Sequence, residues 1–197
     1  MTGNFRLRLW DENDAVERER LVSFLSGQTW TYHGNARPTA ESVREGMAQG
    51  RYAGEETRTF WVVETGAASL SGGPAPTAET IVGLVRVFDL GDSTPVFDVR
   101  IGEAHRGRGI GTEALRRLAD YVFTEFPDKE RLEGHTRADN YAMRKAFYKA
   151  GFVKEAVHRR SWPSADGTMH DSIGYSIIRP DWAEGKRTPI DWNDFPY

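Results

Sequence analysis

A glycine-rich turn lies near the middle of the chain, between two segments with clear apolar patterns. Its sequence is Arg106-Gly107-Arg108-Gly109-Ile110-Gly111-Thr112. Residues 96–101 before it form an apolar run typical of a strand, and apolar residues after it recur at helical spacing until Pro127. The glycines are therefore predicted to form a strand-to-helix turn. Because the first N–H groups of a helix have no partner within the helix, such a turn is well suited to bind phosphate.

The turn fits one phosphate-binding pattern better than two others. The chain has no Gly-x-x-x-x-Gly-Lys-Ser/Thr run, which a Walker loop requires. A dinucleotide fingerprint would need a third glycine where Thr112 stands. Arg106, Gly109 and Gly111 instead fit Arg-x-x-Gly-x-Gly, and in this the chain resembles the GNAT acyltransferase superfamily, which binds a pyrophosphate at this loop. An ordinary glycine-rich turn that begins a helix remains the alternative.

Composition narrows the classes of function. The chain has 197 residues, enough for one domain with a proper core. Its 26 basic and 29 acidic residues give a net charge of −3, which indicates neither a nucleic-acid partner nor an anionic membrane. The sequence contains no cysteine, which excludes disulfides, thiolate metal sites and a cysteine nucleophile. The five histidines show no paired ligand spacing, so no metal site is expected.

The apolar segments are short. None approaches the length of a membrane span, and the N-terminal residues lack the apolar core of a signal peptide. We therefore expect a cytoplasmic protein without a membrane partner.

The remaining patterns predict strands and helices in alternation. The expected strands are residues 5–10, 60–64, 81–90, 96–101, 131–136, 153–162 and 169–178. Four helices are expected, over residues 14–27, 39–50, 110–127 and 140–150. The resulting order, β-α-α-β-β-β-α-β-α-β-β, predicts an α/β (α+β) fold with a central twisted mixed sheet and helices on both faces.

One domain is expected over residues 1–178. Residues 66–80, rich in Gly, Ala, Ser and Pro, are predicted to form a hairpin tip inside it. Residues 179–197 form a polar tail with too many aromatic residues for a free segment, so we expect it to pack on the domain or across a homodimer. These aromatic residues are Trp182, Trp192, Phe195 and Tyr197.

A second motif extends the resemblance over nearly the whole chain. The element order is the GNAT order. Residues 140–152, which begin Asn140-Tyr141-Ala142-Met143-Arg144, look like the fourth-helix signature of the branch that acetylates ribosomal-protein N-termini. The last hairpin, with Gly167, Asp171 and Tyr175, looks like that branch too.

The resemblance implies acetyl-CoA as the acyl donor. Backbone groups of Val99 and Ile101 would pair with the pantetheine arm as an added strand. Asn140 would stand near the thioester, although it could equally be a plain helix N-cap. The pyrophosphate would be held by the turn, that is by Arg106, Gly107, Arg108, Gly109, Ile110, Gly111 and Thr112.

Asp98 is the candidate general base. Alternation puts Phe97, Val99 and Ile101 on one face of their strand, and Asp98 and Arg100 on the other. If the first face is core, the second lines the substrate groove, where Asp98 could take the proton that an amine loses before it attacks the thioester. The alternative is a surface ion pair of Asp98 with Arg100, of little consequence.

The general acid does not follow the resemblance. Many members of the family that the chain resembles carry a tyrosine seven residues after the helix-capping asparagine, where this chain has Phe147. The ribosomal branch often has a serine three residues after it, where this chain has Met143. Tyr148 is the favoured substitute and Tyr141 the second. Protonation of the leaving thiolate by water is the third option, since proximity alone supplies much of the rate.

The resemblance implies an acceptor site in the segment after the first helix and in the last hairpin. Aromatic rings that face a cleft can bind a cation. An alternative is that Trp30 and Tyr32 only close the core under the first two helices. The candidate acceptor residues are Trp30, Tyr32, His33, Arg100 and Trp162.

Two functions from different classes follow. The first is an acetyl-CoA-dependent N-acetyltransferase whose acceptor is the primary amine of a small molecule or a protein N-terminus. The second is a regulatory module that binds acyl-CoA and is weak or inactive as a catalyst, which only the absence of the usual acid supports.

Overall fold

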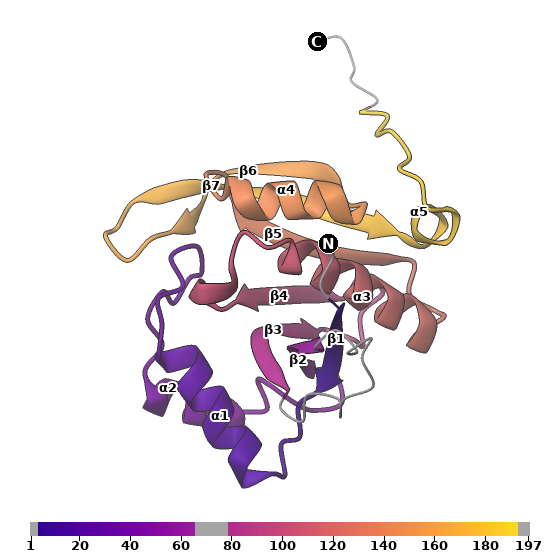
Figure 1. Ribbon diagram of the computed structural model, residues 1–197. Coiled ribbons are helices and arrows are strands. Elements are labelled where there is room, and N and C mark those ends of the chain that lie inside the picture. Colours follow the sequence, from indigo (N-terminus) through magenta and orange to yellow (C-terminus); the bar gives the residue numbers. More distant parts are fainter. Residues whose placement is uncertain (1–3, 66–78, 193–197) are drawn as a thin grey trace, which may run out of the picture.

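The computed structural model describes residues 4–65 and 79–192, so most of the predicted hairpin tip, and Phe195 and Tyr197 of the tail, lie outside the described residues. The elements, drawn in Figure 1, are β1 (Asn4–Leu9), α1 (Ala15–Ser26), α2 (Ala40–Ala48), β2 (Arg58–Thr65), β3 (Thr80–Phe88), β4 (Val96–Ile101), the 3-10 turn η1 (Glu103–His105), α3 (Ile110–Glu125), β5 (Arg131–Arg137), α4 (Tyr141–Ala150), β6 (Val153–Pro163), β7 (Met169–Ile178) and α5 (Arg179–Glu184). The predicted order of strands and helices is confirmed, with η1 and α5 added to it.

The strands form one mixed sheet in the order β1-β2-β3-β4-β5-β7-β6. Every neighbouring pair is antiparallel except β4 and β5, which are parallel. Within the described sheet, β4 and β5 pair at Val96 and Glu133 alone, whereas β4 pairs with β3 along its whole length. The sheet is therefore open between β4 and β5 beyond this pair.

Helices cover both faces of the sheet. In Figure 1, α1 and α2 lie together on one side, and α4 lies along β6 and β7. β2 alternates between the two cores: Phe60 and Val62 pack in the core beneath α3 and α4, and Trp61 and Val63 pack in the core beneath α1 and α2. This alternation is what the period of a strand requires when both of its faces are buried.

Short-range signals set the helix ends. The Asp14 carboxylate accepts a hydrogen bond from the Val16 N–H at 2.8 Å, and α1 begins behind it. Gly151 takes the left-handed conformation, with φ of 101°, and ends α4. Val16 is mostly exposed, because it lies in the first turn of α1 on the side away from the buried Leu21.

α5 packs the beginning of the tail (residues 179–197) against the domain. Arg179 donates to the carbonyl oxygens of Phe123, Phe126 and Lys129 at 2.8–2.9 Å, which satisfies carbonyl groups at the end of α3 and in the turn after it. Trp182 packs on Phe123 with 5.3 Å between ring centroids and donates its N–H to Asp120. The sequence indicated a packed tail but not the helix that packs it.

Truncation after Ile178 should lower the free energy of unfolding by about 3 kcal/mol, because it removes these charge-assisted hydrogen bonds and the packing of the partly buried Trp182 indole. For a chain of this size that corresponds to a melting temperature lower by on the order of 10 °C, measured by thermal denaturation. A matched truncation after Ile190 keeps every contact of α5 and should melt close to the full chain. Equal melting temperatures for both truncations would show that α5 is passive.

Candidate active site

A cavity of about 420 Å³ lies where the sheet is open. It is bounded by one strand, two helix N-termini and the loop between α1 and α2. Its lining residues are Trp30, Thr31, Tyr32, His33, Val99, Ile101, His105, Arg106, Gly107, Gly109, Ile110, Gly111, Thr112, Asn140, Ala142, Met143, Lys145, Ala146 and Lys149. The structure thus brings together most of the residues that the sequence indicated for a donor and for an acceptor.

The glycine turn forms one end of this cavity and begins α3, as predicted. Gly107 and Gly109 have φ of 78° and 83°, in the left-handed region that favours glycine. A Cβ added at Gly109 would meet no atom within 4 Å, so the space in front of the turn is open. The turn therefore leaves room for an anion at the N-terminus of a sixteen-residue helix.

The two arginines of the turn have different positions. Arg106 lines the cavity and donates to the carbonyl oxygens of Ile101 at 3.1 Å and Thr29 at 3.3 Å. It therefore joins the turn to the end of β4 and to the α1–α2 loop. Arg108 does not line the cavity; it pairs with Glu64 and hydrogen-bonds His105.

One face of α4 forms the wall opposite β4. Asn140 lines the cavity and also caps α4, since its side-chain oxygen accepts the Met143 N–H at 3.2 Å, so its two expected roles are compatible. Lys145 and Lys149 line the cavity as well, and the sequence analysis missed them. Their signal was available, because Ala142, Lys145 and Lys149 recur at helical spacing on one face.

The two faces of β4 are used differently from our expectation. Val99 and Ile101, on the same face as Phe97, line the cavity. Asp98 and Arg100, which we expected in the groove, lie on the other face and are absent from the lining. The opening beside β4 exposes Val99 and Ile101, which a closed sheet would have buried.

Asp98 is held from two sides. Its Oδ1 lies 3.0 Å from Nε2 of His33, and its Oδ2 accepts a hydrogen bond from Nε of Arg100 at 2.8 Å. Burial raises the pKa of the Asp98 carboxyl, but Arg100, then His33 and Arg86, outweigh burial and hold the pKa well below its usual range. A carboxylate that stays ionised with both oxygens engaged is a weak proton acceptor.

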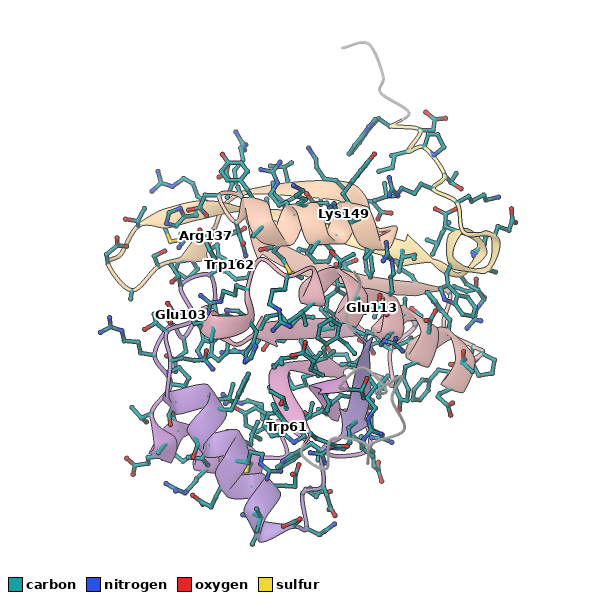
Figure 2. The ribbon with its side chains drawn as sticks, in the orientation of Figure 1. Trp61, Glu103, Glu113, Arg137, Lys149 and Trp162 are labelled. Atoms are coloured by element: carbon teal, nitrogen blue, oxygen red, sulfur yellow. The ribbon has the colours of Figure 1, made fainter. Side chains whose placement is uncertain are left out.

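The aromatic residues of the α1–α2 loop differ in their contacts with the core and the cavity. Trp30 is only 2% exposed and donates its N–H to the Leu25 carbonyl at 2.8 Å, so it belongs to the core and to the cavity wall at once. Tyr32 lines the cavity with the Arg137 guanidinium 4.8 Å from its ring centroid. Trp162 does not line the cavity; Figure 2 shows it with Arg137 near the N-terminal end of α4, and Lys149 toward the other end.

A family model described as an acetyltransferase (GNAT) domain matches residues 4–153. The chain belongs to the GNAT acetyltransferase family. The predicted family is thereby confirmed, and the branch that acetylates ribosomal proteins stays a prediction.

Individual relatives agree with this GNAT assignment. The chain is 30% identical over 106 residues to a probable N-acetyltransferase, YjcK, of Bacillus subtilis, which covers 52% of this chain and 58% of the relative. It is 29% identical over 83 residues to the uncharacterized N-acetyltransferase p20 of Bacillus licheniformis, covering 42% and 46%. The chain thus spans about half the length of these curated relatives.

Solved structures share the GNAT fold. The spermidine N-acetyltransferase of Vibrio cholerae, in complex with CoA and spermine, superposes with a TM-score of 0.72 at 16% identity, over 91% of this chain and 98% of that one. A GNAT-family acetyltransferase from Bacillus anthracis gives 0.68 at 17% identity, over 90% and 96%. At these identities the likeness is one of fold.

The candidate acids of this GNAT chain lie outside the cavity lining. Tyr148 is 63% exposed, and the tail residue Arg187 lies 4.0 Å from its ring centroid. Tyr141 is 72% exposed. Phe147, at the position where the resemblance led us to expect a tyrosine, is fully buried and stacks on Tyr175 with 4.5 Å between centroids. In this chain the side chain at that position packs in the core.

Two further observations concern the described part of the chain. It contains no group of three or more His, Asp or Glu side chains that could hold a metal ion. No helix within residues 4–65 and 79–192 is long and apolar enough to cross a membrane.

Gly109→Ala should raise the Kd for acetyl-CoA roughly tenfold or more, because the added methyl occupies the space open to a phosphate. Gly167→Ala is the matched control, since Gly167 has φ of 82° and equally open surroundings but lies in the β6–β7 turn. Both variants should lose about 1 kcal/mol of stability from backbone strain. Calorimetry in which both variants bind acetyl-CoA like the wild type would contradict a phosphate site here.

Asp98→Asn should make stability less dependent on acid pH. The folded-state pKa of Asp98 lies below its value of about 3.9 in the unfolded chain. The ionised carboxylate therefore stabilises the fold above that pH, and this contribution is lost as the pH falls toward the folded value. Urea unfolding at pH 7, 5 and 3 should show a destabilisation by Asp98→Asn that shrinks toward pH 3. Asp92→Asn, in an exposed turn, should show no such change, and a constant difference for Asp98→Asn would refute the ion-pair account.

Proposed function

We propose that the protein is an acetyl-CoA-dependent N-acetyltransferase that acts on a primary amine in a ternary complex. The observation that carries this proposal is the continuity of the cavity, which runs from the glycine turn to Trp30, Tyr32 and His33. A donor bound at the turn and an acceptor bound at the aromatic loop would meet in it without a covalent enzyme intermediate.

Acetyl-CoA fits the residues of this cavity. The free N–H groups at the start of α3 would bind the pyrophosphate, and Arg106, Lys145 and Lys149 add positive charge along its path. The pantetheine arm would extend between Val99 and Ile101 of β4 and the start of α4. The exposed edge of β4 offers it main-chain hydrogen bonds of the kind a strand would receive.

The chemistry requires removal of a proton from the amine and protonation of the thiolate that leaves. As general acid, Tyr148 would need Arg187 to move from its ring. Solvent needs no rearrangement, and we propose it as the proton source. The narrow cavity would contribute chiefly by holding the amine beside the thioester.

The lining residues favour an acceptor with one amine. Among the described residues that line the cavity there is no aspartate or glutamate, whereas a polyamine carries several positive charges that need acidic partners. The Vibrio cholerae protein is named for spermidine, and its likeness to this chain is one of fold. We therefore favour a small monoamine or a protein N-terminus, the latter in keeping with the ribosomal-protein branch.

Thiol release from acetyl-CoA, measured over a panel of amines, tests this proposal. The panel contains small monoamines, spermidine, and one peptide with a free and with a blocked N-terminus. We expect turnover with a monoamine or with the free peptide, at a kcat/KM at least roughly tenfold above that for spermidine. Binding of acetyl-CoA without turnover of any amine would instead support the regulatory module.

A further inference from the structure

The two ring nitrogens of His33 have different surroundings. Nε2 lies 3.0 Å from Oδ1 of Asp98. Nδ1 is buried and, within the described part of the chain, has no hydrogen-bond partner, while the His33 side chain lines the cavity. A buried polar atom without a partner is unfavourable, so an unmet nitrogen at a substrate cavity needs an explanation.

The Asp98 contact determines which nitrogen of the neutral imidazole carries its proton. Arg100 binds the other oxygen of Asp98, and the carboxylate stays ionised. An ionised carboxylate only accepts hydrogen bonds, so Nε2 of His33 must donate to it. Nδ1 of the neutral imidazole is then left with a lone pair and no proton, which makes it a proton acceptor.

The loop that carries His33 is held in place on several sides. The backbone N–H of His33 donates to the Trp30 carbonyl oxygen at 2.9 Å, and the backbone N–H of Trp30 donates to the Ala36 carbonyl oxygen at 2.8 Å. The Trp30 ring meets the imidazole edge-on, with 5.9 Å between centroids. The imidazole is therefore fixed by Asp98, by Trp30 and by its own turn.

We propose that His33 is the general base of the acetyl transfer and that Asp98 is a positioning residue that acts through it. The inference rests on the function proposed above and deepens it. Asp98 is absent from the cavity lining and has both oxygens engaged, whereas His33 lines the cavity and its Nδ1 has no hydrogen-bond partner among the described residues.

Transfer of the acetyl group removes two protons from the acceptor nitrogen. The acceptor ammonium gives one proton to Nδ1 of His33, and the freed lone pair forms the C–N bond to the acetyl carbon. The C–S bond breaks with its electron pair going to sulfur. The second proton lost by nitrogen ends on the thiolate through solvent, and the proton on Nδ1 returns to solvent.

The charges around His33 suit this role. Asp98 compensates the imidazolium that forms, in the way that a buried carboxylate supports a catalytic histidine. The cationic and titratable groups that face this pair or share its cavity are Tyr32 of the α1–α2 loop, Arg86 of β3, Arg100 of β4, His105 and Arg106 before α3, and Lys145 and Lys149 of α4.

His33→Gln is the decisive variant, because the glutamine amide can still donate to Asp98 but cannot take up a proton. With the best amine of the panel, kcat/KM near neutral pH should fall roughly 10²-fold or more. The fall of the rate toward acid pH should disappear, since histidine is the side chain that changes charge in that range. The Kd for acetyl-CoA should stay within about twofold, as calorimetry would show. His158→Gln, at an exposed position of β6, is the matched control and should keep the wild-type profile.

A second experiment does not depend on the glutamine variant. His33→Ala should regain activity when imidazole is added, because free imidazole can occupy the vacated space and accept the proton. The inference would be overturned if His33→Gln kept kcat/KM within threefold of the wild type together with the fall of the rate toward acid pH. It would also be overturned if imidazole had no effect on His33→Ala. In either case, turnover by the wild type would leave the proposed function standing. An inactive wild type would overturn both.

Discussion

The separation of β4 from β5 is the constraint on which the site depends. Phe97 of β4 packs directly over Gly134 of β5, so close that a Cβ at Gly134 would lie 2.5 Å from the ring. Phe147 and Phe152 pack around the same ring with 5.9 and 5.7 Å between centroids. Behind this cluster the two strands pair at Val96 and Glu133 alone within the described sheet. The aromatic cluster in the core and the open sheet edge at the cavity therefore arise from the same packing of β4 against β5.

The same aromatic cluster fixes which face of α4 meets the cavity. Phe147 stacks on Tyr175 in the core, so the residues one position before and two after it, Ala146 and Lys149, face the cavity. Tyr148 is turned toward solvent and the tail. A tyrosine at position 147 would here be buried against Tyr175, which gives a packing reason for the phenylalanine. The missing phenol therefore reflects the packing of this core, and it gives no support of its own to a loss of catalysis.

The secondary structure and the glycine turn could be predicted from the sequence, whereas contacts between residues far apart in the chain could not. Apolar periods gave the strands and helices, and glycine spacing gave the phosphate turn, because these depend on neighbours within a few residues. The alternation of β4 was read correctly, but which face meets the cavity depends on the opening toward β5, which no local pattern reports. His33 was included only as an acceptor contact. Its pairing with Asp98, 65 residues away, exists only in the folded chain.

Arg106 connects the glycine turn at one end of the cavity with the aromatic α1–α2 loop at the other. Its side chain donates to the carbonyl oxygens of Ile101, the last residue of β4, and of Thr29 in the α1–α2 loop. Its guanidinium lies 5.9 Å from the Trp30 ring centroid. The turn that would hold the pyrophosphate therefore also supports the loop that carries His33. Reaction between an amine and a thioester gains most when both are held at a fixed separation, and this gain is lost with small displacements. A single arginine bonded to the end of β4 and to the α1–α2 loop would keep that separation constant.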